Sequence, residues 1–418
     1  MNKKDNPVIK LFRGFFTLAL IICLLIPVVQ AVDIFGEEEI IFTAEDGAYA
    51  YGAIDSDNIL ISEIYPGKDG SGWSRLYLYN ISSEILEELP VEDPPDFNRM
   101  DLYKNIAVWN RIVEKEDFVE GKFSIYAYNI DERNDPQIIA ENFNSVNCLK
   151  IEEKTLVITG RDSFSLDSGD HGDIYTYNFN ERSLTCYKPP GCQGTVAISG
   201  TYIVFSDDRY GQMRNTVHVM NLETGDRYQI SDEEKGVYSS PDISGENVVC
   251  CFDEDFGSFL KDEAPQQLLL TTISTNKTRV IASPGARISS PKIDGDNIVW
   301  SDKRRGIYSI WLYNLNENKE TLISDTEGEY GGAVDISHDT VMWSDTVNDR
   351  SVLKIKRIAT SVISGDIPES TQQVLENPGT SALEENPPKT AGLSSGLPLL
   401  AVILGLCCIV RRMVAYKK

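Results

Sequence analysis

The stretch Asn297-Ile298-Val299-Trp300-Ser301-Asp302, followed after a short gap by Ile310-Trp311-Leu312-Tyr313-Asn314, decides the fold. Both segments are almost continuously apolar and rich in β-branched and aromatic residues, which is typical of strands covered on both faces. The residues between them have the character of a loop that joins two antiparallel strands. This pair of strands recurs along the chain, so the sequence predicts a repeat architecture.

The first strand of the pair has seven versions, which follow one another at steps of 43 to 50 residues. Their last residues are Ile61, Trp109, Ile158, Phe205, Cys250, Trp300 and Trp343. Five of the seven second strands end in asparagine, at Asn80, Asn129, Asn178, Asn221 and Asn314. The gap between the two strands varies in length, as it does when the insertions of a repeat lie on one face.

Two further pieces complete each unit. A short apolar segment and a tight turn precede the first strand, as in Ile293-Asp294-Gly295-Asp296-Asn297, where Gly and Asn tolerate positive φ. A polar turn and another short strand follow the second, as in Asn318 to Ser324. Four strands per unit at this period are typical of a propeller blade. The sequence therefore predicts an all-β fold, a seven-bladed β-propeller of four-stranded blades over residues 32–360.

The seventh unit has no fourth strand of its own. Its first strand is expected at Thr340 to Trp343 and its second at Val352 to Ile358, after which the chain becomes polar. The start of the chain has a spare strand, Glu39 to Thr43, which occupies the position of a fourth strand. We therefore expect this strand to pair beside Val352 to Ile358 and to close the ring, because closure removes an exposed strand edge.

Three strings resemble a known family: DGDNIVWSDKR (294–304), SIWLYNLNENKETLIS (309–324) and SSPDISGENVV (239–249). They are similar to the TolB-like, WD40-like propeller repeats that are abundant in surface proteins of methanogenic archaea. The resemblance extends roughly from Ile40 to Ile358 and implies a propeller at the cell surface. It does not imply an activity, because propellers host unrelated functions.

Both ends of the chain indicate export. Residues 1–31 contain four basic residues before an uncharged run and end in the cleavage-like Val29-Gln30-Ala31, which predicts a signal peptide, with an uncleaved anchor as the alternative. Residues 361–391 are rich in Pro, Ser, Thr and Glu and are expected to form a disordered stalk. Residues 392–410 are uncharged and long enough for a transmembrane helix.

A basic tail at residues 411–418 follows that helix, which places the tail in the cytoplasm and the propeller outside in a single-pass membrane protein. The tail also resembles archaeal sorting signals, but the Pro-Gly-Phe motif is missing, which favours a plain transmembrane helix. The whole chain carries a net charge of −25. Because residues 1–31 carry +3 and residues 392–418 carry +4, the part between them carries −32. This charge argues against a nucleic-acid partner, whose phosphates need a basic surface.

Candidate binding and modification sites are few. The carboxylates Asp167, Asp170 and Asp173 share one loop and are the calcium candidate, although their spacing differs from that of an EF-hand, and no other metal or cofactor is expected. Similar carboxylates lie in the repeated hairpin turn, where turn chemistry explains them: Asp55, Asp57, Asp294 and Asp296. Cys186 and Cys192 close a short turn and could form a disulfide in an exported protein. The glycosylation sequons are at Asn80 and Asn276, of which Asn80 is also the repeated strand-end asparagine.

The sequence predicts no catalytic residues. It has no G-x-S-x-G motif, and its three histidines, His171, His218 and His338, fall in different units without ligand spacing. The repeated Ser-Asp-x-Arg, which occurs at 206–209 and 301–304, resembles a site, but because it recurs by unit it is expected to form blade-to-loop hydrogen bonds and ion pairs. We therefore expect a non-enzyme, while a channel that gathered carboxylates and histidine would favour an enzyme.

The function expected from the sequence is a membrane-anchored, cell-surface propeller that binds or scaffolds a surface protein or a glycan. Its expected contact surface is formed by the longest loops, which lie between Cys250 and Leu269, between Ile158 and Ile174, and between Ile61 and Leu76. One alternative is a propeller lyase or hydrolase that acts on envelope or external polysaccharide. The other is a TolB-like envelope assembly factor, against which the absence of an N-terminal domain counts.

The predicted topology can be tested by adding protease to intact cells. We expect release of a fragment that ends within Ser361 to Thr390, because an unpacked stalk is the preferred cleavage site. Mass spectrometry of the released fragment would locate the cut. Repeats that survive on intact cells but are degraded after lysis would place the propeller inside.

Overall fold

The computed structural model describes residues 35–66, 73–91, 99–117, 120–161, 172–211, 214–254, 266–327 and 333–358. The chain divides into two compact units, residues 1–362 and 363–418, and all described residues belong to the first. The predicted signal peptide (1–31), stalk (361–391), transmembrane helix (392–410) and basic tail (411–418) lie outside them. Within the described ranges there is no helix long and apolar enough to cross a bilayer.

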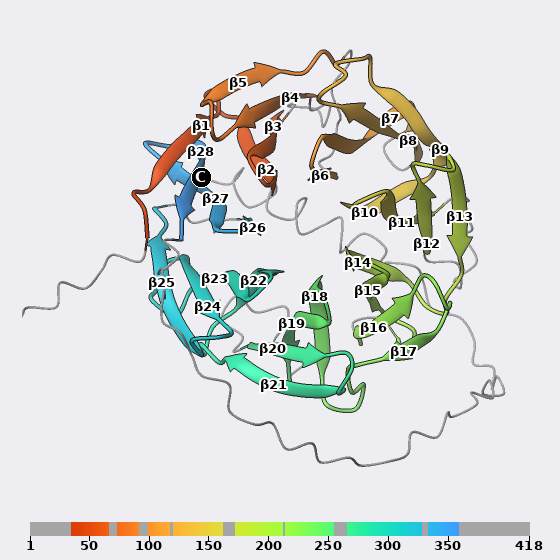
Figure 1. Cartoon of the computed structure of the whole chain (residues 1–418), viewed down its shortest axis with the longest axis vertical. Helices are drawn as coiled ribbons and strands as arrows, with labels where there is room; N and C mark the ends of the chain where they lie inside the picture. The colour runs from red at the N-terminus through yellow and green to blue at the C-terminus, as the bar shows by residue number, and fades with distance from the viewer. Residues whose placement is uncertain are drawn as a thin grey trace, which may run out of the picture. The chain divides into compact units, whose positions relative to one another are not determined.

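In the described residues, twenty-eight strands form seven four-stranded antiparallel sheets, which stand around a ring (Figure 1). Blade 1 consists of β2 (Tyr49–Asp55), β3 (Asn58–Tyr65), β4 (Trp73–Asn80) and β5 (Ile85–Glu88). Blade 2 consists of β6 (Met100–Tyr103), β7 (Ile106–Asp117), β8 (Glu120–Asn129) and β9 (Gln137–Phe143). Blade 3 consists of β10 (Ser145–Glu152), β11 (Thr155–Arg161), β12 (Asp173–Asn178) and β13 (Ser183–Tyr187).

The next three blades repeat this arrangement. Blade 4 consists of β14 (Gln193–Ser199), β15 (Tyr202–Asp207), β16 (Thr216–Asn221) and β17 (Arg227–Gln229). Blade 5 consists of β18 (Val237–Ser244), β19 (Asn247–Asp253), β20 (Gln267–Thr272) and β21 (Lys277–Ala282). Blade 6 consists of β22 (Ile288–Asp294), β23 (Asn297–Asp302), β24 (Ser309–Asn314) and β25 (Lys319–Asp325). The predicted seven-bladed all-β propeller is confirmed.

Blade 7 takes its strands from both ends of the propeller. Its order is β1-β28-β27-β26, from β26 (Val334–Ser337), β27 (Thr340–Val347) and β28 (Arg350–Arg357) with β1 (Glu39–Thr43) as the outer strand. β1 runs antiparallel to β28, with Glu39 opposite Ile355 and Thr43 opposite Val352. The predicted closure of the ring by the first strand is therefore confirmed.

The hydrophobic core is divided into seven clusters, one between each pair of neighbouring blades. Alternate residues of one strand enter different clusters: Ile59 and Ile61 of β3 face blade 7, whereas Leu60 faces blade 2. This is why the middle strands are apolar at every position. Trp109 of β7, Trp300 of β23 and Trp343 of β27 are wholly buried in the second strands of their blades.

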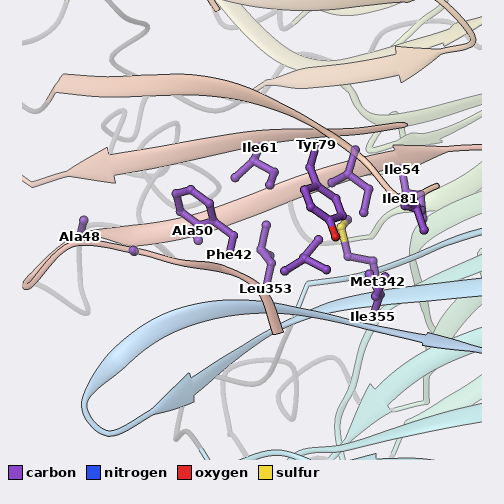
Figure 2. Close-up of a cluster of buried hydrophobic side chains, with 13 residues drawn as sticks. Phe42, Ala48, Ala50, Ile54, Ile61, Tyr79, Ile81, Met342, Leu353 and Ile355 are labelled. Carbon is purple, nitrogen blue, oxygen red and sulfur yellow. The ribbon is translucent and has the colours of Figure 1, made fainter. Parts of the chain in front are cut away.

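Side chains reinforce the closure. Lys354 of β28 is only 6% exposed, and its Nζ lies 2.7 Å from Glu38 Oε1 and 2.8 Å from Asp345 Oδ2. Glu38 also accepts a hydrogen bond from Ser324 Oγ of blade 6, at 2.7 Å. In the seam between blades 7 and 1, Phe42 packs in the same cluster as Leu353 (Figure 2). β1 and the residue before it, Glu38, therefore connect blades 6, 7 and 1.

The asparagine that ends the third strand in five of the blades caps the turn that follows. Asn314 Oδ1 accepts hydrogen bonds from the backbone N–H groups of Asn316 and Glu317, at 3.1 and 2.9 Å. Its Nδ2 donates to Asn297 Oδ1 of the neighbouring strand, at 2.8 Å. The other four asparagines bond the following turn in the same way. This Asx-turn chemistry explains why asparagine recurs.

Removal of the closing strand should destabilise the propeller. A chain that begins at Gly47 loses Ile41 and Phe42 from the seam and leaves Lys354 with one carboxylate fewer. Burying a large apolar side chain contributes about 1.5–3 kcal/mol, so a loss of several kcal/mol is expected, or a Tm lower by roughly 5–10 °C. Calorimetry against a chain that begins at Val32 would measure the difference.

Two variants of the longer chain provide controls for that comparison. Phe42→Ala should reproduce part of the loss, because this side chain is buried. Ile40→Ala, on the same strand but 48% exposed, should change Tm little. Equal Tm values for the chains that begin at Gly47 and Val32 would contradict closure by β1.

Candidate binding face and central channel

The propeller has two ends that differ in their connections. At the turn face, tight turns join the first strand to the second in each blade and the third to the fourth in blades 1 to 6. At the loop face lie the connections from the second strand to the third and the links between blades. The inner strands β2, β6, β10, β14, β18, β22 and β26 lie nearest the centre of the ring, and we call the region that they face the channel (Figure 1).

One position of each inner strand carries an unusual set of residues. It is the residue that directly precedes the last Ile or Leu of the strand. We call this set the inner ring, and around the channel it comprises Ala53, Asp101, Lys150, Ala197, Asp242, Lys292 and Asp335. Three acidic and two basic side chains therefore occupy equivalent places in five of the seven blades.

Each inner-ring aspartate bonds the next blade. Asp101 Oδ2 accepts from the backbone N–H of Ile151 at 2.8 Å, and its Oδ1 lies 2.8 Å from Lys150 Nζ. Asp242 Oδ2 accepts from the N–H of Ile293 at 2.9 Å, with Lys292 Nζ 3.8 Å from its other oxygen.

Asp335 makes the same contact across the closure of the ring. Its Oδ2 accepts from the N–H of Ile54 in blade 1, at 3.4 Å. The inner ring is therefore a set of blade-to-blade contacts that continues from blade 7 to blade 1.

The charges of the inner ring act on one another across the channel. Burial raises the pKa of Asp101 and of Asp242, and the nearby lysines oppose this rise. Burial alone would lower the pKa of Lys150, but the carboxylates Asp101, Asp335 and Asp242 outweigh burial and raise it. Since Asp335 belongs to blade 7 and Lys150 to blade 3, the groups form one electrostatic network. The lysines balance part of its negative charge.

A second set of contacts lies at the turn face, two residues beyond the inner-ring position, on six of the seven inner strands described. The last residue of the strand accepts a hydrogen bond from the backbone N–H of the turn in the next blade. The acceptors are Asp55, Glu152, Ser199, Ser244, Asp294 and Ser337, and the donors are Lys104, Gly200, Gly245, Gly295, His338 and Ser56. Asp55 and Asp294, which turn chemistry explained from sequence, thus bond the turn of the neighbouring blade.

The remaining turn carboxylates stay within their own blade. Asp57 accepts from Ser82 Oγ at 2.8 Å, and Asp296 accepts from Asn316 Nδ2 at 2.5 Å. The described histidines do not join the inner ring. His218 is buried on β16, and His338 is exposed in the β26–β27 turn, while His171 lies outside the described residues. In the described part of the chain, lysines accompany the inner-ring carboxylates and no histidine does.

The Ser-Asp-x-Arg motif forms the ion pairs expected from sequence. Asp207 is buried and accepts from Arg209 Nε at 2.9 Å and from Arg209 Nη2 at 3.0 Å. Asp302 does the same with Arg304, whose guanidinium carbon lies 4.1 Å from the centre of the Trp311 ring. The structural interpretation of this motif is confirmed.

The other predicted site residues are only partly described. Asp167 and Asp170 lie outside the described residues, and Asp173 lies buried 3.4 Å from Lys188 Nζ, so the calcium site stays a prediction. Among the residues described, no group of three or more possible metal ligands occurs. Cys186 is exposed, whereas burial raises the pKa of the Cys192 thiol to about 12, and a bridge between them stays a prediction.

The two sequons lie in different settings. Asn80 is half-buried and uses both its side-chain atoms, since Nδ2 donates to Asn58 Oδ1 and Oδ1 accepts from Ser83. Asn276 is exposed, in a turn with a φ of 48°. Glycosylation at either site stays a prediction. Of the two asparagines, Asn276 is the one whose side chain makes no hydrogen bond to another described residue.

The loop face carries an aromatic cluster that the sequence analysis missed. Tyr65 ends β3 and Trp73 begins β4, directly opposite, and their rings stack with centroids 3.8 Å apart and planes 7° apart. The guanidinium of Arg75, two residues along β4, lies 4.9 Å from the Trp73 ring centre and bonds Glu45 at 3.1 Å. The alternation Trp73-Ser74-Arg75 could have placed Trp73 and Arg75 on one face, but it could not have supplied Tyr65.

The turn face carries a polar cleft of about 330 Å³ at the seam between blades 7 and 1. Its walls are Ser56, Asp57, Ser82, Ser337, His338, Asp339, Thr340 and Arg357. Several of these side chains are already hydrogen-bonded to one another: Ser82 bonds Asp57, Thr340 bonds Asp339, and Ser337 lies 3.0 Å from His338 Nδ1. Much of the hydrogen-bonding capacity of the cleft is therefore already used by its own side chains.

Comparison with known proteins supports the fold. No protein-family model and no curated protein matches the sequence. The β-propeller domain of the trilobed protease from Pyrococcus furiosus, described as having an open velcro topology, superposes with a TM-score of 0.56 and 10% identity over 78% of this chain and 99% of that one. An oligogalacturonate lyase in complex with manganese gives a TM-score of 0.52 and 9% identity over 78% of this chain and 99% of that one.

TolB from Acinetobacter baumannii is more distant, with a TM-score of 0.41 and 11% identity over 73% of this chain and 78% of that one. This similarity is too low to support any inference from TolB to this chain. At such identities the comparisons show a shared propeller fold alone. The propeller implied by the sequence resemblance is confirmed, and membership of a TolB-like sequence family stays a prediction.

The buried His218 should make the propeller sensitive to acid. Burial, followed by the charge of Arg209, lowers the pKa of His218 from 6.5 to about 4. The unfolded chain then binds more protons than the folded chain between these pH values, so stability falls as the pH drops through that window. The full effect amounts to about 3 kcal/mol. Urea unfolding of the native chain and of His218→Gln at pH 7 and pH 4.5 would measure it.

Other acidic groups titrate in the same pH range. The test is therefore the difference between the native chain and His218→Gln in the stability that each loses on acidification. His218→Gln keeps a polar atom near Thr216, whose hydroxyl lies 3.0 Å from His218 Nε2. The variant should therefore lose less stability on acidification than the native chain. Equal losses would show that folding leaves the pKa of His218 unchanged.

Proposed function

We propose that this protein is a membrane-anchored binding or scaffold module of the cell surface, whose propeller holds a surface protein or glycan at its loop face. The predicted signal peptide, transmembrane helix and basic tail support this location. The main observation behind the proposal is that the carboxylates facing the channel are used to hold neighbouring blades together. Asp101, Asp242 and Asp335 of the inner ring all accept backbone hydrogen bonds from the next blade.

A general acid or base must reach its substrate with a proton that it can give or take. The inner-ring carboxylates instead hold neighbouring blades, and Lys150 and Lys292 lie beside two of them. Their chemistry suits a rigid support better than a reaction centre. The loop face, by contrast, presents aromatic and charged side chains at the ends of strands, as a binding surface on a stable scaffold does.

The alternatives from sequence have less support. Similarity to an oligogalacturonate lyase concerns the fold at 9% identity, and the described channel adds no histidine to its carboxylates. The weak similarity to TolB does not favour an assembly factor. The three long loops that were expected to form the contact surface lie largely outside the described residues. The evidence for binding at the loop face therefore comes from side chains at the strand ends next to these loops.

Binding can be separated from catalysis by one experiment. The purified, fluorescently labelled chain should bind isolated cell envelope of the source organism saturably, without releasing soluble fragments of any envelope polymer. Asp242→Asn should lower Tm by several degrees, because it weakens the bond to Ile293 and the pairing with Lys292. Below its Tm this variant should bind as well as the native chain.

The opposite results are equally clear. Release of polymer fragments by the native chain that is lost in Asp242→Asn would establish an enzyme with a catalytic channel. Absence of saturable binding to any envelope fraction would contradict the binding function itself. Asp242→Ala in parallel would separate loss of charge from loss of the side chain.

A further inference from the structure

The aromatic cluster of the loop face has an exposed tryptophan. All five tryptophans of the chain are described. Three of them are wholly buried and Trp311 is partly buried, whereas Trp73 is 42% exposed. Its partner Tyr65 is half-buried and fixed at the end of β3. A rigid strand end thus presents the largest aromatic side chain to solvent at the face where we place binding.

The geometry indicates which side of Trp73 is open. The guanidinium carbon of Arg75 lies 4.9 Å from the Trp73 ring centre and 5.6 Å from that of Tyr65. A group stacked on the outer face of Trp73 would lie about 4 Å beyond it, and so roughly 8 Å from Tyr65. Arg75 is therefore beside the stacked pair, not above it. Neither Tyr65 nor Arg75 covers the outer face of the indole.

The polar groups beside this face are held in place. Arg75 Nη1 donates to Glu45 Oε1 at 3.1 Å. Glu63 is buried and accepts from the Glu45 backbone N–H at 2.6 Å and from Tyr77 Oη at 3.0 Å. Burial, then Glu63 and Glu45, raise the pKa of Tyr65, so its hydroxyl stays protonated. A flat apolar surface thus lies next to a fixed guanidinium and carboxylate.

We propose that the outer face of Trp73 is a subsite for a neutral hexopyranose unit of a glycan, an inference that rests on the binding function proposed above. The C–H face of a sugar ring is weakly positive and packs on the negative face of an indole. The hydroxyls at the rim of the same sugar can bond Arg75 and Glu45, which offer both a donor and an acceptor. Few other ligands combine one flat apolar face with a polar edge.

The charges around the cluster favour a neutral sugar over an acidic one. The cation Arg75 lies beside the cluster, but it is already bonded to Glu45 and lies 3.9 Å from Glu88. The exported part of the chain carries −32, which repels a polyanion. A protein partner is the competing occupant. A stable protein interface needs about 800 Å² from each partner, considerably more than one stacked pair of rings supplies.

The test uses the full chain in a detergent without a sugar headgroup, with neutral hexasaccharides of glucose, galactose and mannose as probes and hexagalacturonate as the charged comparison. Because Trp73 is the exposed tryptophan, its fluorescence should change when a sugar stacks on it. We expect at least one neutral hexasaccharide to bind. Trp73→Ala should weaken that binding at least tenfold, and Trp73→Phe, which keeps an aromatic ring, should restore part of it. Because both variants lack the reporting indole, titration calorimetry would measure their affinities and that of the native chain.

Tyr210→Ala is the matched control. Tyr210 also lies in a loop-face connection and is also 42% exposed, but it belongs to blade 4, where its hydroxyl donates to Gln229 Oε1 at 3.0 Å. Its removal should leave sugar binding unchanged, as read by tryptophan fluorescence. Equal Tm values for the native chain and Trp73→Ala would exclude loss of folding as the cause of any weakened binding.

Three results would overturn the inference. They are no binding of any neutral hexasaccharide, equal binding by Trp73→Ala and the native chain, or tighter binding of hexagalacturonate. Envelope binding that persists in Trp73→Ala and is abolished when the envelope is treated with protease would assign a protein partner instead. In that case the proposed binding function would stand while the sugar subsite would fall.

Discussion

A blade whose two faces are both apolar cannot be buried by itself, so every sheet of this molecule depends on a neighbour on each side. The seven core clusters, one in each interface, express this constraint. A row of such blades would end in two exposed apolar faces. The pairing of β1 with β28 removes both ends at once and makes the first residues of the propeller part of its last blade. In this respect the chain differs from the Pyrococcus furiosus propeller domain, which is described as open.

Apolar packing brings blades together but does not fix their register, because it has little directional preference. Hydrogen bonds from inner-strand side chains to the backbone of the next blade supply that direction. They occur at two levels, the inner ring and the turn face, and both levels continue across the closure, from Asp335 to Ile54 and from Ser337 to Ser56. Each bond contributes on the order of 1 kcal/mol, so the set matters more than any member.

Much of the fold follows from the sequence because the repeat shows each strand seven times, and because the spacing after Glu39 to Thr43 matches that of later units. The site was less accessible. No single unit reveals the inner ring, since its residues differ from blade to blade and share only a position. The Tyr65–Trp73 stack depends on the register of two strands across a connection of variable length, which periodicity does not determine. The Asx-turn asparagines were visible because all five bond the backbone in the same way.

The division of chemistry between the channel and the loop face has a physical basis. Near the channel the inner strands converge, so a charged side chain there contacts the next blade and acts on charges across the ring, as Asp335 does on Lys150. Changing one such group alters the support of its neighbours. At the loop face the strands end, and each connection from a second strand to a third belongs to one blade. A side chain such as Trp73 can therefore be exchanged with little effect on the ring, which is the condition for a binding surface that varies while the scaffold stays the same.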